Sequence, residues 1–224
     1  MVDRPGGGPT VAVVLAAGGG RRFGGTKQLA LLGGRALVGH VVAAAAAGGA
    51  EQVVVVVGQD APAVTQAARD QQPVHVVPTP DVAAGQAASL VAGIEAAVTL
   101  DAEVVVVLLA DQPEVAPEAV RAVTAAVRGG APVARVRYHD GPGHPVAFAA
   151  RVLGRLGALR GDRGARELLG ELGVVEVAWD GPAPVDLDTR AAWQAAVGRW
   201  ETRDPVPDQR SPSCREQDGQ ARQP

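Results

Sequence analysis

Short runs of valine without polar alternation recur along this chain and constrain its fold more than any other feature. They lie at residues 10–17, 51–58, 73–77, 102–110, 131–138 and 173–179. Continuous β-branched runs of this length are typical of strands buried on both faces, as in a parallel sheet covered by helices. Alanine-rich segments separate them, at residues 36–47, 61–70, 86–99, 117–128, 149–159 and 163–172. The alternation predicts an α/β fold, a three-layer α/β/α sandwich around a mostly parallel sheet.

The apolar pattern predicts one domain over residues 10–201, which contain no internal repeat and no evident linker. A hydrophobic fraction of 47% and a charged fraction of 20% support a folded body. Residues 1–9 and 202–224 contain little that could be buried. We therefore expect a disordered leader and a disordered tail.

The charge balance and the cysteine count exclude several classes of protein. A formal net charge of −3 offers no basic surface for nucleic acid or an anionic membrane, so we expect neither as a partner. The one cysteine, Cys214, excludes an intramolecular disulfide framework and a cysteine-rich metal site, which predicts a cytoplasmic location. The apolar run at residues 11–17 has only the minimum length of a signal-peptide core, and the glycines and arginines that follow it argue against secretion.

A glycine-rich loop follows the first predicted strand, where residues 15–27 read LAAGGGRRFGGTK. Glycines let backbone N–H groups surround a phosphate chain, and Arg21, Arg22 and Lys27 supply positive charge. The chain has 20 arginines and one lysine, so Lys27 is not surface filler. A compact ammonium on a flexible stem suits a phosphate that moves during a reaction. The loop predicts a triphosphate site, and a flexible turn with solvated charges remains the alternative.

The two best-known phosphate loops do not match this segment. The dinucleotide fingerprint would need a third glycine where the chain has Phe23. In the Walker A loop a lysine follows the last glycine directly, whereas here Thr26 separates Gly25 from Lys27. The phosphate loop predicted here is therefore of another type.

Acidic residues follow the fourth strand and precede the last helical segment. Asp111 lies in LLADQP, directly after the strand. A carboxylate at the edge of a central strand could bind a divalent cation or could only form a turn. Asp186 and Asp188 lie in DLDT, before residues of helical character. Either Asp188 or Thr189 could cap that helix, and the second metal carboxylate could be Asp186 or Asp188.

Two later segments are candidates for contacts with a second substrate. His144 lies in GPGHPVAF, which we expect to be a glycine- and proline-rich loop, and it could serve substrate contact or structure. Residues 161–166 read GDRGAR and place two guanidinium groups where a helix is expected to start. They suit an anionic group, although an ordinary capped surface turn explains them equally well.

In this order, LAAGGGRRFGGTKQL, LLADQP, GPGHPVAF, GDRGAR and DLDT resemble the molybdenum cofactor cytidylyltransferases over about residues 10–198. The resemblance implies a Rossmann-like fold of the nucleotide-diphospho-sugar transferase type. It also implies transfer of CMP from CTP to the terminal phosphate of a molybdopterin-type cofactor, with Mg²⁺ as cofactor and pyrophosphate as product. A molybdenum enzyme or its insertion chaperone would be the protein partner.

The resemblance also assigns site residues position by position. It implies that Lys27, Arg22 and Asp111 act in catalysis, and that Asp111 and Asp188 hold Mg²⁺. The nucleotide contacts it implies are Leu15, Ala16, Ala17, Gly18, Gly19, Gly20, Lys27, Asp81, Gln86 and Ser89. The acceptor contacts it implies are His144, Asp162, Arg163 and Arg166.

The chain departs from the family pattern at three positions. Gly20 stands where serine is frequent, Phe23 where methionine is usual, and Arg190 where proline often follows the last acidic motif. We interpret Phe23 as a packing change with little consequence. Ala17 resembles the cytidylyl members more than the guanylyl members, which favours CTP.

Three other functions remain as alternatives. The nearest is a related nucleotidyltransferase that uses GTP with molybdopterin, or another acceptor such as a sugar phosphate, a methylerythritol phosphate or a phospholactate. A nucleotide-binding oxidoreductase is disfavoured by Phe23 and by the lack of an acid at the expected distance. The last is a non-catalytic nucleotide-binding module that guides cofactor insertion into a molybdenum enzyme.

Overall fold

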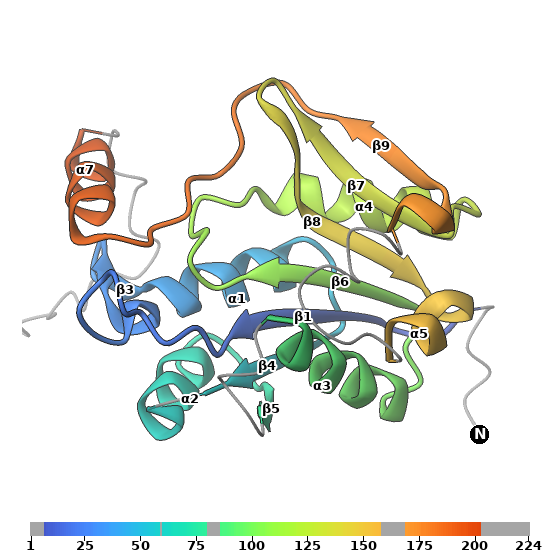
Figure 1. Cartoon of the computed structure of the whole chain (residues 1–224), viewed down its shortest axis with the longest axis horizontal. Coiled ribbons are helices and arrows are strands. Elements are labelled where there is room, and N and C mark those ends of the chain that lie inside the picture. The colour runs from blue at the N-terminus through green and yellow to red at the C-terminus, as the bar shows by residue number, and fades with distance from the viewer. Residues whose placement is uncertain (1–6, 59, 80–85, 158–168, 203–224) are drawn as a thin grey trace, which may run out of the picture.

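A mostly parallel sheet forms the centre of the molecule. The computed structural model describes residues 7–58, 60–79, 86–157 and 169–202 (Figure 1). Within these residues one sheet has seven strands in the order β5-β4-β1-β6-β8-β7-β9. The strands are β1 (Thr10–Ala16), β4 (Gln52–Val57), β5 (His75–Pro78), β6 (Val104–Leu109), β7 (Val133–Tyr138), β8 (Gly141–Ala149) and β9 (Val174–Ala178). Of these strands only β8 runs antiparallel to its neighbours, which confirms the predicted mostly parallel sheet.

Of the seven strands of this sheet, β8 is the one that the sequence pattern did not predict. We expected His144 to lie in a loop, and this is wrong, because residues 141–149 pair with both β6 and β7. Glycines and prolines interrupt this segment, so it lacks the continuous apolar run by which the other strands were recognised. The register shifts between Arg135 and Val136 of β7, and His144 and Pro145 have no register partners there. A proline is tolerated inside a sheet at such an irregularity.

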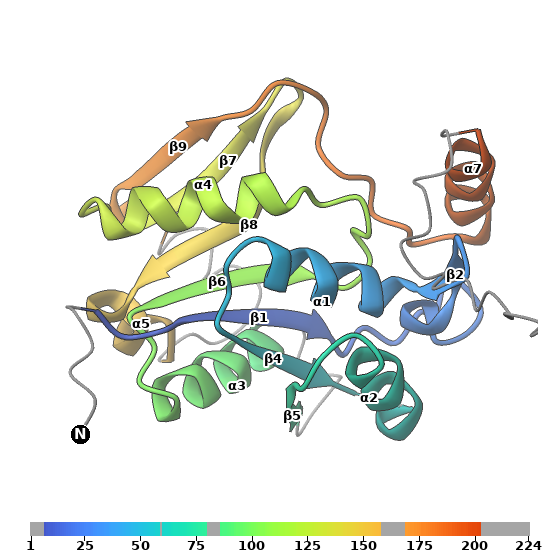
Figure 2. The ribbon, with the colours of Figure 1, turned by 180° about the vertical axis from the view of Figure 1, so that it is seen from behind.

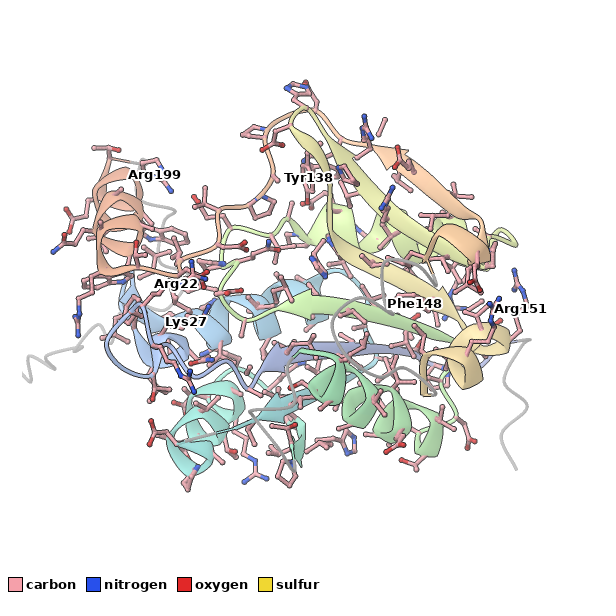
Figure 3. All side chains as sticks on the ribbon, viewed as in Figure 1. Arg22, Lys27, Tyr138, Phe148, Arg151 and Arg199 are labelled. Carbon is pink, nitrogen blue, oxygen red and sulfur yellow. The ribbon has the colours of Figure 1, made fainter. Side chains whose placement is uncertain are left out.

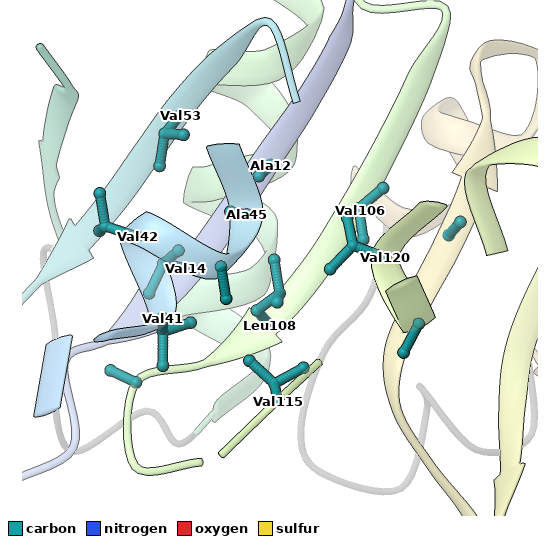
Figure 4. Packing of buried hydrophobic residues seen from close by; sticks show 14 of the residues in the cluster. Ala12, Val14, Val41, Val42, Ala45, Val53, Val106, Leu108, Val115 and Val120 are labelled. Atoms are coloured by element: carbon teal, nitrogen blue, oxygen red, sulfur yellow. The ribbon is translucent and has the colours of Figure 1, made fainter. Parts of the chain in front are cut away.

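Two helical layers cover the sheet and complete the predicted three-layer sandwich (Figures 1 and 2). On one face lie α1 (Leu37–Ala47), α2 (Ala61–Arg69) and α4 (Pro117–Arg128), and on the other lie α3 (Gln86–Thr99) and α5 (Ala150–Gly157). Successive side chains of a strand point to opposite faces. Ala12 and Val14 of β1 therefore pack into the first core, part of which is drawn in Figure 4, and Val11 and Val13 pack into the second.

A small separate core joins the C-terminal helix to a hairpin near the end of β1. The hairpin consists of β2 (Leu31–Leu32) and β3 (Arg35–Ala36), and α7 (Arg190–Glu201) lies beside it in both views (Figures 1 and 2). Leu32, Leu187 and Ala196 are buried in this core. At the hairpin turn Gly33 has φ +55°, and a Cβ there would lie 2.2 Å from Trp200 Nε1. Glycine at this turn therefore allows α7 to approach closely.

Several predictions concern residues outside the described ranges. The expected leader and tail lie there except for residues 7–9 and 202, as does most of the helix expected at 163–172. The single domain over residues 10–201 stays a prediction. Among the helices of the described residues, none is long and apolar enough to cross a membrane.

Candidate active site

The glycine-rich loop leaves the carboxyl end of β1 and folds into a tight turn around one carbonyl. The carbonyl oxygen of Gly20 accepts backbone hydrogen bonds from Phe23 at 2.9 Å and from Gly24 at 2.9 Å. Gly20 has φ +53°, and a Cβ there would lie 2.0 Å from the carbonyl oxygen of Gly25. Because both the dihedral angle and the close approach require glycine, no side-chain hydroxyl fits at this position in this chain.

Lys27 lies at the end of the loop and joins two acidic residues that are distant in sequence. It opens a short 3-10 helix, η1 (Lys27–Leu29), and is buried. Its Nζ atom lies 2.5 Å from Asp111 Oδ2 and also forms an ion pair with Asp188 Oδ1. Arg22 Nη2 lies 2.8 Å from Asp188 Oδ2. Figure 3 shows Arg22 and Lys27 on the side of the molecule that carries α7. The structure thus brings together four of the predicted catalytic and metal-binding residues.

A strap of backbone and side-chain hydrogen bonds holds Asp188 at the end of β6. The amide of Leu187 donates to the carbonyl of Asp111 at 3.0 Å, and Gln112 Nε2 donates to Asp186 Oδ1 at 2.8 Å. The N-cap of α7 is Thr189, whose Oγ1 accepts from the amide of Ala192 at 3.1 Å. Since Thr189 caps the helix, the carboxylate of Asp188 is left to face the site.

The charges of this cluster stabilise each other. Burial disfavours the charged ammonium of Lys27, but the hydrogen bonds and negative charges of Asp111 and Asp188 outweigh it and raise the pKa of Lys27. The hydrogen bond from Lys27, with the positive charges of Lys27 and Arg22, lowers the pKa of Asp188. Burial raises the pKa of Asp186, the carboxyl group that does not contact Lys27. These shifts favour a positive Lys27 and a negative Asp188 at neutral pH.

A cavity of about 250 Å³ opens between the carboxyl ends of β1 and β6, and the glycine-rich loop forms one wall. Small and apolar residues form most of its lining, and the side chains of Lys27, Gln28, Ser89 and Asp111 add polar groups. The lining residues are Leu15, Ala17, Gly18, Gly19, Lys27, Gln28, Ser89, Leu109, Ala110 and Asp111. Ligands of open α/β sheets bind in this position, outside the carboxyl ends of the strands.

The cavity lining includes three residues that sequence reasoning missed, Gln28, Leu109 and Ala110. Gln28 is buried, and its Nε2 donates to the carbonyl oxygen of Gly18 at 2.8 Å. This bond fixes the first part of the loop against η1. For Gln28 the only signal in the sequence was its position next to Lys27, because a single glutamine belongs to no recognisable motif.

Other predicted nucleotide and acceptor contacts lie apart from the cavity lining or outside the described residues. Ala16 is buried in the core under α1, on the opposite side of β1 from Leu15. Gln86 begins α3. Asp81, Asp162, Arg163 and Arg166 lie outside the described residues.

His144 is partly buried in β8. Tyr138 Oη donates to its carbonyl oxygen at 2.7 Å. Burial lowers the pKa of His144 to about 4, although the negative charge of Asp111 works in the other direction. The imidazole is therefore neutral near pH 7, which suits hydrogen bonding rather than charge neutralisation.

The carboxylates that converge on Lys27 give a two-ligand arrangement rather than a complete metal cage. In the part of the chain that the structure describes, no group of three or more His, Cys, Asp or Glu residues is arranged to hold a metal ion. A site that binds Mg²⁺ through one or two carboxylates commonly completes its coordination with water and substrate phosphates. The donor set present here, two carboxylates next to a phosphate-type loop, fits that mode of binding.

Comparison with known proteins identifies the family. The MobA-like NTP transferase domain matches residues 12–177. The chain belongs to this family. No curated protein matches this MobA-like NTP transferase significantly. The match and the sheet topology confirm the predicted fold of the nucleotide-diphospho-sugar transferase type. The family match makes the protein a nucleotidyltransferase.

Solved structures support the same assignment. The crystal structure of Rv0371c from Mycobacterium tuberculosis H37Rv is 36% identical, covers 86% of this chain and 99% of that chain, and gives a TM-score of 0.75. A complex of Rv0371c with manganese is 35% identical over 85% of this chain and 98% of that chain, with a TM-score of 0.70. The nucleotidyl transferase Mth528 from Methanothermobacter is 25% identical over 87% of this chain and 99% of that chain, with a TM-score of 0.72.

Proposed function

We propose that this MobA-like NTP transferase transfers CMP from CTP to the terminal phosphate of a molybdopterin-type acceptor. The observation that carries the proposal is the position of Lys27, which joins Asp111 and Asp188 at the wall of a cavity beside the glycine-rich loop. The family supports nucleotidyl transfer, and the motifs quoted above support the acceptor. The protein has a low net charge, so the charged groups that would bind a triphosphate are confined to this site.

The reaction needs little covalent chemistry from the protein. A terminal oxygen of the acceptor phosphate attacks the α-phosphorus, the bond to the bridging oxygen breaks, and pyrophosphate leaves with that electron pair. The acceptor phosphate is already anionic, so no protein base is required. Catalysis then depends on positioning and on charge neutralisation.

The residues of the loop would carry that neutralisation. The backbone N–H groups around Gly18 and Gly19 and the ammonium of Lys27 would bind the β- and γ-phosphates, and Arg22 would approach them from the exposed side. In the described structure Lys27 neutralises Asp111 and Asp188. When a triphosphate binds, the flexible stem of Lys27 lets its ammonium turn from these carboxylates to the phosphates.

Asp111 and Asp188 are the residues that would hold Mg²⁺. Their oxygens converge on a single nitrogen atom, Nζ of Lys27, and this arrangement supports a cation shared by both carboxylates. A bound Mg²⁺ would neutralise charge on the phosphate that is transferred. The complex of the similar protein Rv0371c with manganese supports a divalent cation in this family.

The base and the acceptor would be recognised by separate groups of residues. Ser89 lines the cavity near the start of α3, and with Asp81 and Gln86 it is proposed to contact the base and ribose. His144 would face the acceptor as a neutral hydrogen-bonding group. Asp162, Arg163 and Arg166 are proposed to bind an anionic group of the acceptor, and a molybdenum enzyme or its insertion chaperone would receive the product in the cytoplasm.

The decisive experiment is a substrate screen. The protein is incubated with Mg²⁺, with each of the four ribonucleoside triphosphates in turn, and with molybdopterin or its molybdenum form, and pyrophosphate release is measured. CTP is expected to give the highest rate. A preference for GTP would correct the base, turnover only with a sugar phosphate or a phospholactate would correct the acceptor, and no turnover with any pair would refute the proposal.

A variant tests the role of the loop in the same assay. Lys27→Ala should lose about 100-fold or more in turnover at saturating substrates, because the charge that stabilises the leaving pyrophosphate is removed. Arg135→Ala is the matched control. Arg135 Nη2 lies 2.6 Å from Glu176 Oε1, and neither residue lines the cavity. Near-normal turnover of Lys27→Ala would show that the loop does not act on the leaving group.

A further inference from the structure

Within residues 18–25 of the glycine-rich loop, Phe23 has the only buried side chain. Phe23 is only 5% exposed, whereas its neighbours Arg21 and Arg22 are exposed. The Phe23 ring meets the ring of Trp193 on α7 edge to face, with centroids 6.4 Å apart and an interplanar angle of 73°. The guanidinium carbon of Arg190 lies 5.2 Å from the centroid of the Phe23 ring. Our expectation that Phe23 is of little consequence does not account for these contacts.

The partners of Phe23 are themselves fixed in place. Trp193 Nε1 donates to the carbonyl oxygen of Leu31 in β2 at 2.9 Å, which ties α7 to the hairpin. Leu187, just before α7, and Ala196 of α7 are buried together with Leu32 of the hairpin. Phe23 therefore packs on a platform that is held by its own core.

The helix that provides this platform lies beyond the family domain. The MobA-like NTP transferase domain matches residues 12–177, and α7 spans Arg190–Glu201. Two positions at which the chain departs from the family pattern, Phe23 and Arg190, contact each other across this boundary. The residue just before the N-cap of α7, Asp188, also forms ion pairs with Arg22 and Lys27. Each of these contacts joins the loop to the N-terminal end of α7.

We propose that Phe23, Trp193 and Arg190 form an aromatic clamp by which α7 holds the glycine-rich loop in the conformation that binds nucleotide. Residues 18–25 include five glycines, so an unanchored loop would lose much conformational entropy when it closes on a ligand. A contact that orders the loop beforehand lowers that cost and raises affinity. The clamp residues are positioning residues, because they act on the nucleotide only through the loop.

The part of the inference that concerns nucleotide rests on the proposed function, so the test has two independent readouts. The first is the rate at which trypsin cleaves after Arg21 and Arg22 in the folded protein, followed by mass spectrometry. This rate reports how often the loop opens and requires no substrate. The second is the dissociation constant for CTP with Mg²⁺, together with KM for CTP and kcat once turnover is established.

Arg190→Ala is the main variant because this side chain is exposed and its loss should not unfold the protein. We expect cleavage after Arg21 and Arg22 to become about two- to fivefold faster, from the loss of the cation–π contact. The dissociation constant and KM for CTP should rise by a similar factor while kcat stays within about twofold. Phe23→Leu, which keeps an apolar side chain and removes the ring, should give a larger effect in the same direction. Arg199→Ala on the same helix, where Arg199 pairs with Glu114 at 3.3 Å, should change neither readout.

The outcomes separate the two proposals. Unchanged cleavage in both Arg190→Ala and Phe23→Leu would overturn the clamp. Faster cleavage with unchanged CTP affinity would support the anchoring of the loop and overturn its assignment as the nucleotide loop. If Phe23→Leu fails to fold, Arg190→Ala decides, since its cleavage rate is compared with that of Arg199→Ala. A fall in kcat with unchanged KM would also contradict a positioning role in nucleotide binding.

Discussion

Replacement of Lys27 by methionine should destabilise the protein and make it respond more strongly to a divalent metal. Methionine keeps the length of the side chain and removes its charge. The side chains of Lys27, Asp111 and Asp188 are 11%, 17% and 33% exposed, so the cluster lies between a buried and a surface ion pair. In Lys27→Met, Asp111 loses its ion pair with Lys27, whereas Asp188 keeps its ion pair with Arg22.

The size of the effect follows from that intermediate burial. Removal of one partner from a fully buried ion pair costs about 3–5 kcal/mol, and an exposed pair contributes about 0–1 kcal/mol. We expect a loss of about 1–3 kcal/mol in the free energy of unfolding at pH 7. For a chain of this size this corresponds to a fall in Tm of about 2–12 °C.

Added metal should reverse this loss. A ligand that binds only the folded state adds about 2.7 kcal/mol at a concentration 100 times its dissociation constant. In the wild-type protein Mn²⁺ must compete with the ammonium of Lys27 for Asp111 and Asp188, whereas in Lys27→Met it does not. Without nucleotide, Mn²⁺ should therefore raise the Tm of Lys27→Met more than that of the wild type.

The assay is thermal unfolding with and without Mn²⁺, followed by circular dichroism. Arg135→Met is the control, because it removes a cation from a more exposed ion pair, between β7 and β9, in which the side chains are 29% and 34% exposed. It should cost less than about 1 kcal/mol and should leave the response to Mn²⁺ as in the wild type. If Lys27→Met melts like Arg135→Met and Mn²⁺ shifts both equally, the two carboxylates do not form a cation site.

Further predictions concern the loop, the hairpin and His144. Gly20→Ala should weaken CTP binding and cost about 1–3 kcal/mol in chemical unfolding, since its Cβ would lie 2.0 Å from the carbonyl oxygen of Gly25. Gly33→Ala should displace α7 from the hairpin, because its Cβ would lie 2.2 Å from Trp200 Nε1, and tryptophan fluorescence should report the change. Burial lowers the pKa of His144 to about 4 from 6.5, so the unfolded chain binds more protons between these values. Stability should fall as the pH is lowered from about 6.5 to about 4, and a His144→Gln variant with an unchanged pH slope would contradict this reasoning.

The main layers of the fold could be predicted because their signals are local. Valine runs such as residues 51–58 and 102–110 became β4 and β6, since a continuous apolar run is required of any strand that is buried on both faces. The strand β8 carries no such signal before Val146, because glycine and proline occupy much of its first half. Its place between β6 and β7 depends on partners that a local pattern does not specify.

The sequence by itself determined the alternation of strands and helices, the glycine-rich loop after β1 with Lys27 at its end, and the placement of Asp111 at a strand end. Parallel strands bring their carboxyl ends to one edge of a sheet, so these assignments needed no knowledge of distant contacts. The tertiary structure decided which side chains meet there. Lys27 is 84 residues from Asp111 and 161 residues from Asp188, and Phe23 packs on α7 near the other end of the described chain. Contacts over such separations arise from the packing of whole elements, which periodicity and spacing along the chain do not encode.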